Sequence, residues 1–136
     1  MIRSFGGKAP RVHPTAFVSE FADVIGDVEI GEGSSVWPGA QVLADRGAIK
    51  IGKHTNVQDN SIVRGNGGVD IGDRVVIGHL VTCNARSVGD RVLLGSGSKV
   101  SGGVEIGEDC LVASGSEVPG DMVLPALSLV VGPLRV

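Results

Sequence analysis

The chain has 136 residues, of which 42% are hydrophobic, and 15 acidic and 12 basic residues give it a formal net charge of −3. This length suits a single domain, and the apolar content is sufficient for a hydrophobic core. Because lysine and arginine are not clustered, neither nucleic acid nor an anionic lipid surface is an expected partner. No apolar run is long enough to span a membrane, and residues 1–10 lack the apolar stretch of a secretory signal, so we expect a cytoplasmic protein.

An aliphatic side chain recurs at every sixth position along most of the chain. The series runs without a break through residues 12–42, resumes at 51–63 and 71–83, and continues through 88–124. Eighteen of its nineteen positions hold Val, Ile or Leu, and the exception is Cys83. A glycine often follows the aliphatic residue, and the position four residues on is usually small or aliphatic. The chain is therefore built from hexapeptide repeats.

A period of six residues fits neither an α-helix nor a long amphipathic strand, and it predicts short strands separated by sharp turns. Three hexapeptides make one triangular coil of a parallel β-helix, and coils stacked about 4.8 Å apart bond strand to strand. Glycine, present 22 times, supplies the positive φ angles that the corners need. We expect an all-β, single-domain protein of residues 1–136, with repeats at about 12–124 and a short capping tail at 125–136.

The repeat is interrupted at three places. The interval between successive aliphatic positions is nine residues at 42–51, eight at 63–71 and five at 83–88. The first interval carries Asp45, and the second is a glycine-rich turn that begins at Arg64. Neither has the pattern of a phosphate-binding loop. Irregular loops on a rigid solenoid usually carry the functional groups, so these intervals are the first places to look for a site.

The cysteines and two of the three histidines favour structural roles. Cys83 and Cys110 fall on inward-facing positions, which predicts buried free thiols rather than a disulfide. A soft-metal site that combines Cys83 with a histidine is disfavoured, because its sulfur points into the core. His13 precedes a proline and suits a turn, and His54 suits a solvated corner.

Four segments of the chain resemble the γ-class carbonic anhydrase family: residues 12–40, 51–63, 71–79 and 88–100. The distinctive parts are W-P-G-A, which begins at Trp37, and T-N-V-Q-D within the second segment; the bare hexapeptide pattern also occurs in many acyltransferases. The resemblance implies a left-handed β-helix and a homotrimer with metal sites at the subunit interfaces. The handedness rests on the resemblance alone, because the general preference for right-handed crossovers favours the opposite hand.

The family's chemistry implies three histidines around a zinc ion, two from one subunit and one from its neighbour, with a bound water whose pKa falls to about 7. His79 matches one of the three. Arg64 and Asn84 stand at the other two positions, and an arginine cannot be deprotonated to serve as a ligand. The sequence therefore indicates a member that has lost two of three zinc ligands and is inactive in CO2 hydration. No cofactor is expected unless the metal site has been rebuilt.

The surroundings of that centre are better preserved. Gln58, Asp59 and Asp45 match family positions that orient water or bridge subunits, and we interpret Gln58 and Asp59 here as structural. Arg64 leaves two alternatives open. With Asn84 and the neighbouring chain's His79 it would bind bicarbonate or another small anion, or it pairs with Asp59 or Asp45 and fills the place of the metal.

Two other classes of function remain alternatives. A hexapeptide acyltransferase would bind acyl-CoA between coils and use His54 or His79 as a general base. A trimeric structural subunit, as part of a larger complex, would need no catalytic group. In each case a homotrimer is expected, because Trp37 lies outside the ladder of small residues, where packing against a neighbour would shelter it.

Overall fold

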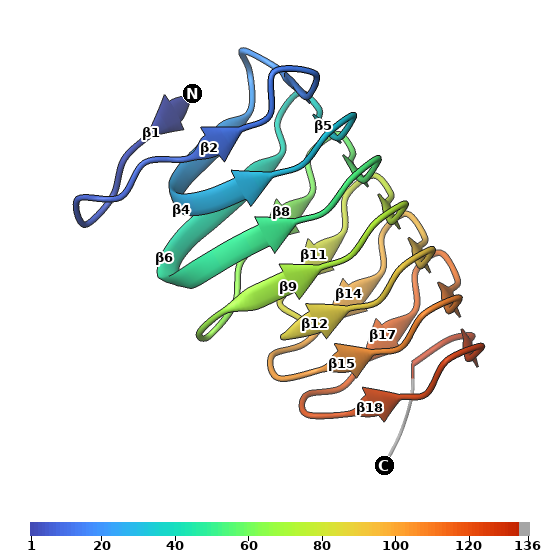
Figure 1. Cartoon of the computed structure of the whole chain (residues 1–136). Helices are drawn as coiled ribbons and strands as arrows, with labels where there is room; N and C mark the ends of the chain where they lie inside the picture. Colours follow the sequence, from blue (N-terminus) through green and yellow to red (C-terminus); the bar gives the residue numbers. More distant parts are fainter. Residues whose placement is uncertain (134–136) are drawn as a thin grey trace.

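The computed structural model describes residues 1–133, and in this range the chain forms a prism of stacked coils made of parallel strands and turns (Figure 1). Each coil contributes a strand to three faces. The strands of the first face are β1 (Ile2–Arg3), the first halves of β4 (Asp23–Ile30) and β6 (Gln41–Ile51), β8 (Ile62–Val63), β11 (Thr82–Cys83), β14 (Lys99–Val100) and β17 (Glu117–Val118).

From each strand of the first face, the chain turns around an edge into a strand of the second face. A strand of the third face then completes the coil. The strands of the second face are β2 (Arg11–Val12), the second halves of β4 and β6, β9 (Val69–Ile71), β12 (Ser87–Val88), β15 (Glu105–Ile106) and β18 (Val123–Leu124). The strands of the third face are β3 (Phe17–Val18), β5 (Ser35–Val36), β7 (Asn56–Val57), β10 (Val76–Ile77), β13 (Leu93–Leu94), β16 (Leu111–Val112) and β19 (Leu129–Val130). Because β4 and β6 continue around an edge, the first two faces form one 12-stranded sheet, and the third is a separate 7-stranded sheet.

The repeat positions stack in register inside the prism. On the first face, Val42 pairs with Val63, Val63 with Cys83, and Cys83 with Val100. All four side chains are completely buried. Burial of apolar surface contributes about 25 cal/mol per Å² to folding, so these aliphatic columns are the main source of stability.

Buried hydroxyl groups satisfy the backbone at the turns. The Ser34 hydroxyl donates to the Gly52 carbonyl over 2.6 Å and accepts the Thr55 N–H over 3.0 Å. One coil later, the Thr55 hydroxyl donates to the Gly72 carbonyl over 2.8 Å and accepts the Val75 N–H over 3.2 Å. This arrangement explains why serine and threonine suit the position four residues after the aliphatic one, which other coils fill with a buried valine such as Val75 or Val81.

All three interruptions of the repeat lie at the same edge of the prism, between the first and second faces. We call residues 43–50, 64–70 and 84–87 the irregular edge. The nine- and eight-residue intervals occur in consecutive coils and are followed by the five-residue interval, whereas the next coil returns to six residues. The strand register on either side is unchanged, so the differences in length appear only as differences in how far each turn projects.

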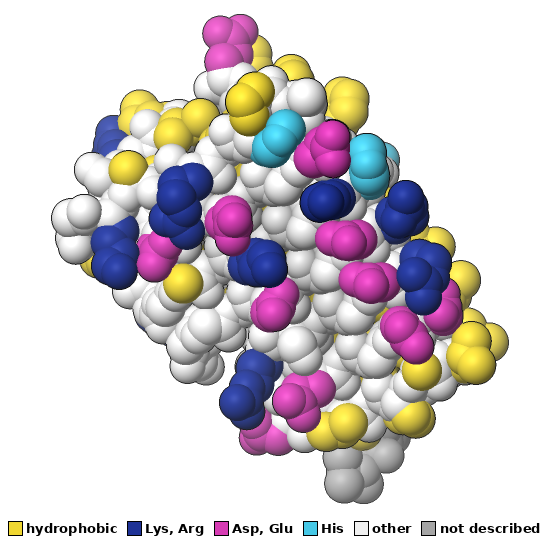
Figure 2. Space-filling view, in the orientation of Figure 1, with side chains coloured by type: hydrophobic (Ala, Val, Ile, Leu, Met, Phe, Trp, Pro, Cys, Tyr) yellow, Lys and Arg dark blue, Asp and Glu magenta, His cyan; other side chains and the backbone are white. Residues whose placement is uncertain are grey.

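The outward-facing side chains distinguish the second and third faces. On the second face, Arg11, Glu29, Lys50 and Asp70 follow one another in register, and Figure 2 shows basic and acidic side chains interspersed over β9, β12 and β15. On the third face, the corresponding column becomes apolar, with leucines in β13, β16 and β19. Alternating charges suit a solvated face, whereas a column of leucines does not.

The all-β parallel solenoid predicted from the repeat is confirmed, and the stack is longer than the predicted range at both ends. Ile2 lies in register with Val24, and Val130, six residues after Leu124, is 2% exposed in β19. The first half of the expected capping tail is thus one further hexapeptide, whose strand β19 completes the last coil, and residues 134–136 lie outside the described part. Within residues 1–133 there is no helix that is long and apolar enough to cross a membrane.

Candidate functional site

Arg64 and Asn84 lie one above the other on the irregular edge. Each follows a strand of the first face, and the pairing of β8 with β11 aligns Val63 with Cys83, so the next residues occupy equivalent places in consecutive coils. The Arg64 N–H donates to the Cys83 carbonyl over 3.1 Å, which fixes this alignment. Both side chains are partly buried. The two sequence-predicted ligand positions are therefore neighbours within a single chain.

Asp45 holds the Arg64 side chain through two hydrogen bonds. Arg64 Nε donates to Asp45 Oδ1 over 3.0 Å, and Nη2 donates to Oδ2. Side-chain exposure is 36% for Arg64 and 28% for Asp45, so the pair is sheltered but not buried. Asp45 lies in the nine-residue interval within β6, and its side chain reaches Arg64 in the next coil. Of the two acidic partners considered from the sequence, Asp45 is therefore the one that Arg64 contacts.

The ion pair changes how both groups titrate. Hydrogen bonding from Arg64 lowers the pKa of Asp45 below its ordinary value, and the same bonds raise the pKa of Arg64. Because the folded-state pKa of Asp45 lies below its unfolded value of about 3.9, the pair stabilises the fold at neutral pH. That contribution is lost as the pH falls through the lowered pKa.

His79, Asp59 and Gln58 lie at a different edge, between the third and first faces. We call it the histidine edge. Pairing of β7 with β10 places Asp59 one coil above His79, and Asp59 Oδ1 lies 3.5 Å from His79 Nδ1. Together with Trp37 and Asn56, these residues line a cavity of about 240 Å³.

The aromatic side chain of Trp37 borders the histidine edge and is ordered by polar contacts. Its Nε1–H donates to the Ser35 hydroxyl over 2.8 Å, which in turn donates to Asn56 Oδ1 over 2.6 Å. The Phe17 ring packs against the indole with a centroid separation of 5.3 Å. Trp37 nevertheless remains 42% exposed.

Leu80, next to His79, was not identified from the sequence. It has a φ of 56° and is 66% exposed. In four other coils the residue at this corner has a positive φ and is glycine or asparagine, whereas the first coil has Phe21 here without a positive φ: the four are Gly39, Asn60, Gly97 and Gly115. A leucine in this conformation costs about 1–2 kcal/mol relative to glycine, so an apolar side chain is retained here against a backbone penalty. The departure from glycine or asparagine at a corner is the sequence signal that would have found it.

The other candidates from the sequence do not join either edge. His13 closes a turn, with its Nδ1 within 2.8 Å of the Thr15 hydroxyl, and His54 is an exposed corner residue. Cys83 and Cys110 are buried free thiols, as predicted. Burial raises the pKa of the Cys83 thiol to about 11, so it remains protonated inside the core and does not complement His79.

The residues that the resemblance predicts at the metal-binding positions do not fit zinc. Zinc takes imidazole, thiolate or carboxylate ligands in a tetrahedral set. Here the corresponding groups are a guanidinium, a carboxamide and, on the other edge, one imidazole. Within residues 1–133 of one chain, no three His, Cys, Asp or Glu side chains are grouped so that they could hold a metal ion. Because the irregular and histidine edges lie on opposite sides of the first face, a site that uses both requires a second copy of the chain.

Comparison with known proteins agrees with this architecture. Residues 87–120 match the bacterial transferase hexapeptide model (six repeats), and residues 48–78 match the hexapeptide repeat of succinyl-transferase. A solved hexapeptide transferase family protein from Anaplasma phagocytophilum is 32% identical, with a TM-score of 0.93, and the match covers 98% of this chain and 82% of that one. The chain is thus a hexapeptide-repeat protein with a left-handed β-solenoid fold.

Two further relatives refine the assignment. "Gamma carbonic anhydrase 1, mitochondrial" of Arabidopsis thaliana is 41% identical over 107 residues, which is 73% of this chain and 39% of that protein. A perosamine N-acetyltransferase variant from Caulobacter crescentus, solved with CoA and GDP-perosamine, is 30% identical with a TM-score of 0.63, and the match covers 90% of this chain and 52% of that one. The chain belongs to the γ-carbonic anhydrase-like family of hexapeptide-repeat proteins. It spans less than two thirds of the length of the curated relatives it matches.

Proposed function

We propose that this chain is a homotrimeric, metal-independent member of its family, with a structural role and without CO2-hydration activity. The observation that carries the proposal is the paired hydrogen bonding of Arg64 by Asp45. Arg64 occupies a position where the family places a zinc-binding histidine. A guanidinium has no lone pair to offer a metal and brings a fixed positive charge to the cation's place.

The same pair argues against a small-anion site at Arg64. Asp45 neutralises the guanidinium and occupies Nε and Nη2, the two groups that would grip a carboxylate side-on. A bicarbonate ion approaching Arg64 would also meet the Asp45 charge. Of the two alternatives for Arg64, filling the metal's place is therefore the better supported.

Trimer formation is supported by what the histidine edge exposes. Leu80 and Trp37 are large apolar side chains left in solvent in one chain. Contact with the irregular edge of a second copy would bury them and would bring His79 and Asp59 close to Arg64 and Asn84. Complete burial of a leucine contributes about 2 kcal/mol, which compensates for its unfavourable φ. In a threefold arrangement, the histidine edge of every chain contacts the irregular edge of the next chain, so no edge of either kind is left without a partner.

The proposal is tested by measuring zinc content and molar mass on the same purified sample. We expect a trimer by light scattering, a zinc content far below one ion per chain, and CO2 hydration no faster than buffer in stopped flow. A monomer would overturn the assembly. One zinc ion per chain together with CO2 hydration would overturn the assignment of Arg64.

Leu80→Asn separates association from folding. Asparagine accepts a positive φ, so the isolated chain should fold at least as well, whereas the subunit contact loses an apolar side chain. We expect the subunit dissociation constant to rise by about tenfold or more, seen as a fall in molar mass on dilution.

Leu127→Asn is the matched control for that change. Leu127 also has a positive φ, 65°, and is 80% exposed, but it lies at the edge between the second and third faces. It should leave the molar mass unchanged. If both variants dissociate equally, or neither does, Leu80 is not at the subunit contact.

A second candidate function, acyl transfer, is favoured by the similarity to a transferase solved with CoA. Acetyl-CoA would then bind between coils, with His54 or His79 as the base. Calorimetry with acetyl-CoA distinguishes it from the first proposal, because a purely structural trimer gives no heat of binding.

A further inference from the structure

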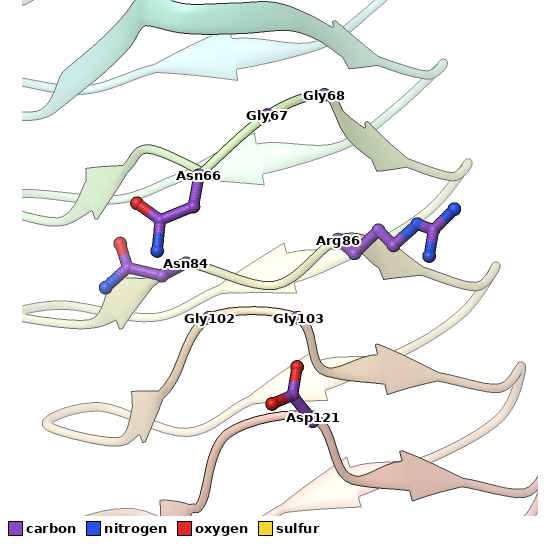
Figure 3. Close-up of a pocket in the computed structure, with 8 residues that line it drawn as sticks. All are labelled: Asn66, Gly67, Gly68, Asn84, Arg86, Gly102, Gly103 and Asp121. Carbon is purple, nitrogen blue, oxygen red and sulfur yellow. The ribbon is translucent and has the colours of Figure 1, made fainter.

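A polar hollow of about 670 Å³ opens on the irregular edge, below the turn that contains Arg64 (Figure 3). Its origin is the sequence of coil lengths. The eight-residue interval projects above it, the five-residue interval recedes behind it, and the regular six-residue turn lies below. The lining residues are Asn66, Gly67, Gly68, Asn84, Arg86, Gly102, Gly103 and Asp121. Apart from the four glycines, all of these residues have polar or charged side chains.

The polar side chains around the hollow have unused hydrogen-bonding capacity. Asn66 Oδ1 accepts from Arg46 over 3.0 Å, which leaves its NH2 group free. The side chains of Asn84, Arg86 and Asp121 form no hydrogen bond or ion pair with any other residue in the range 1–133. Figure 3 shows the polar ends of Asn66 and Asp121 directed inward from above and below, with Asn84 and Arg86 extending to opposite sides.

Three of the other arginines are paired with aspartate, whereas Arg3, Arg46 and Arg74, like Arg86, contact no acidic side chain within residues 1–133. Arg11, Arg64 and Arg91 each contact an aspartate within 3.0 Å. At the hollow, by contrast, the positive Arg86 and the negative Asp121 line one space without contacting each other. A bound group would therefore find a cation and an anion that are both available.

Two of the glycines keep the hollow open without being required by the backbone. Neither Gly68 nor Gly102 has a positive φ. A Cβ on Gly68 would lie 3.7 Å from the Ala48 carbonyl oxygen, which is an ordinary contact, and one on Gly102 would lie 3.2 Å from Asn66 Nδ2, at the end of an exposed side chain. The fold would accept a side chain at either position, and any longer side chain would project into the hollow.

We propose that this hollow binds a small zwitterion that carries both a carboxylate and an ammonium group, such as a free amino acid or a dipeptide. The Arg86 side chain, which extends outward in Figure 3, would turn over the hollow and receive the carboxylate, since a guanidinium binds it through two parallel hydrogen bonds. Asp121 would receive the ammonium group, and the carboxamides of Asn66 and Asn84 would bond to amide or hydroxyl groups between the two ends.

The charges of the hollow select this class over simpler ligands. Arg86 and Asp121 sum to zero, so a plain anion gains an attraction to one group and a repulsion from the other. An apolar ligand finds no hydrophobic wall. The inference goes beyond the proposed structural role, and Arg64 and Asp45 are not among the lining residues. Because five of the lining residues lie on the irregular edge, it requires that the subunit contact leave the hollow open.

The test is a titration of the intact protein, followed by amide NMR or calorimetry, with L-alanine, L-glutamine and L-alanyl-L-alanine. Propionate and ethylamine, which each retain only one charged group, are the matched probes. We expect at least one zwitterion to bind about tenfold or more tightly than either single-charge probe. Comparing the amino acids with the dipeptide shows which of these two kinds of zwitterion the hollow binds more tightly.

Variants locate the binding. Arg86→Gln and Asp121→Asn should each weaken it by about tenfold, and asparagine accepts the positive φ of position 121. Gly102→Leu should abolish it by filling the hollow. Arg74→Gln removes an exposed arginine elsewhere and should have no effect. The proposal is overturned if no zwitterion binds at about 10 mM, if propionate binds as well as L-alanine, or if the Arg86 and Asp121 variants bind unchanged. None of these outcomes alters the zinc content or molar mass.

Discussion

Replacing Arg64 and Asn84 together with histidine is expected to give a trimer that binds about one zinc ion per chain, where the unmodified protein binds far less. The two positions are stacked in consecutive coils, so their imidazoles would face the same space. His79 of a neighbouring chain would supply the third nitrogen. The double change also removes the cation that now occupies the site and frees Asp45 from its ion pair.

Zinc in the Arg64→His, Asn84→His variant is measured by elemental analysis and calorimetry. Binding should weaken below about pH 6.5, because protonated imidazoles cannot bind a metal. Each single substitution serves as a control, since with at most two imidazoles it should retain zinc much less firmly. If the double variant remains trimeric but binds no zinc, the irregular and histidine edges do not meet in the assembly.

Gly52→Ala is expected to destabilise the fold by about 3 kcal/mol, because the added methyl group forces two coils apart. A Cβ on Gly52 would lie 2.6 Å from the Gly72 carbonyl oxygen in the next coil. That oxygen belongs to the backbone and accepts a hydrogen bond from Thr55, so it cannot move without breaking the register. The measurement is the free energy of unfolding in urea.

Gly68→Ala is the matched control for that change. Its Cβ has room and its φ is not positive, so the effect on stability should stay within about 0.5 kcal/mol. Equal losses for the two variants would mean that stability does not depend on the close approach of coils at Gly52.

The fold could be predicted from the sequence because the hexapeptide period constrains every coil in the same way. From Val24 to Leu124 each aliphatic position of the series is buried, Val12 and Val18 pack against that core, and Cys83 takes its place in a column of valines. The sequence does not predict the last hexapeptide, which ends at Val130, because proline and leucine at 125–129 obscure a repeat position that still falls six residues after Leu124. Handedness could not be obtained from spacing, which is the same in a coil of either hand.

The candidate site was only partly predictable. Arg64 and Asp45 could be named from their positions, but the choice between Asp45 and Asp59 depends on how the nine-residue interval turns back over the next coil. Asp59 belongs to another edge, which no local pattern reveals. The hollow is harder still to anticipate. It arises from the difference in length between consecutive coils, and Arg86 and Asp121 lie 35 positions apart in the sequence.

The confinement of all length variation to one edge has a practical consequence for engineering. In the single chain, peptides inserted at the tip of the eight-residue turn, beside Gly67, would extend into solvent, because a Cβ there meets no atom within 4 Å. The strands before and after that turn would keep their partners, so foreign loops of differing size could be displayed on an otherwise unaltered rod. A trimer whose subunit contact leaves this turn uncovered would carry three such insertions, at a spacing set by the scaffold rather than by the inserted sequence.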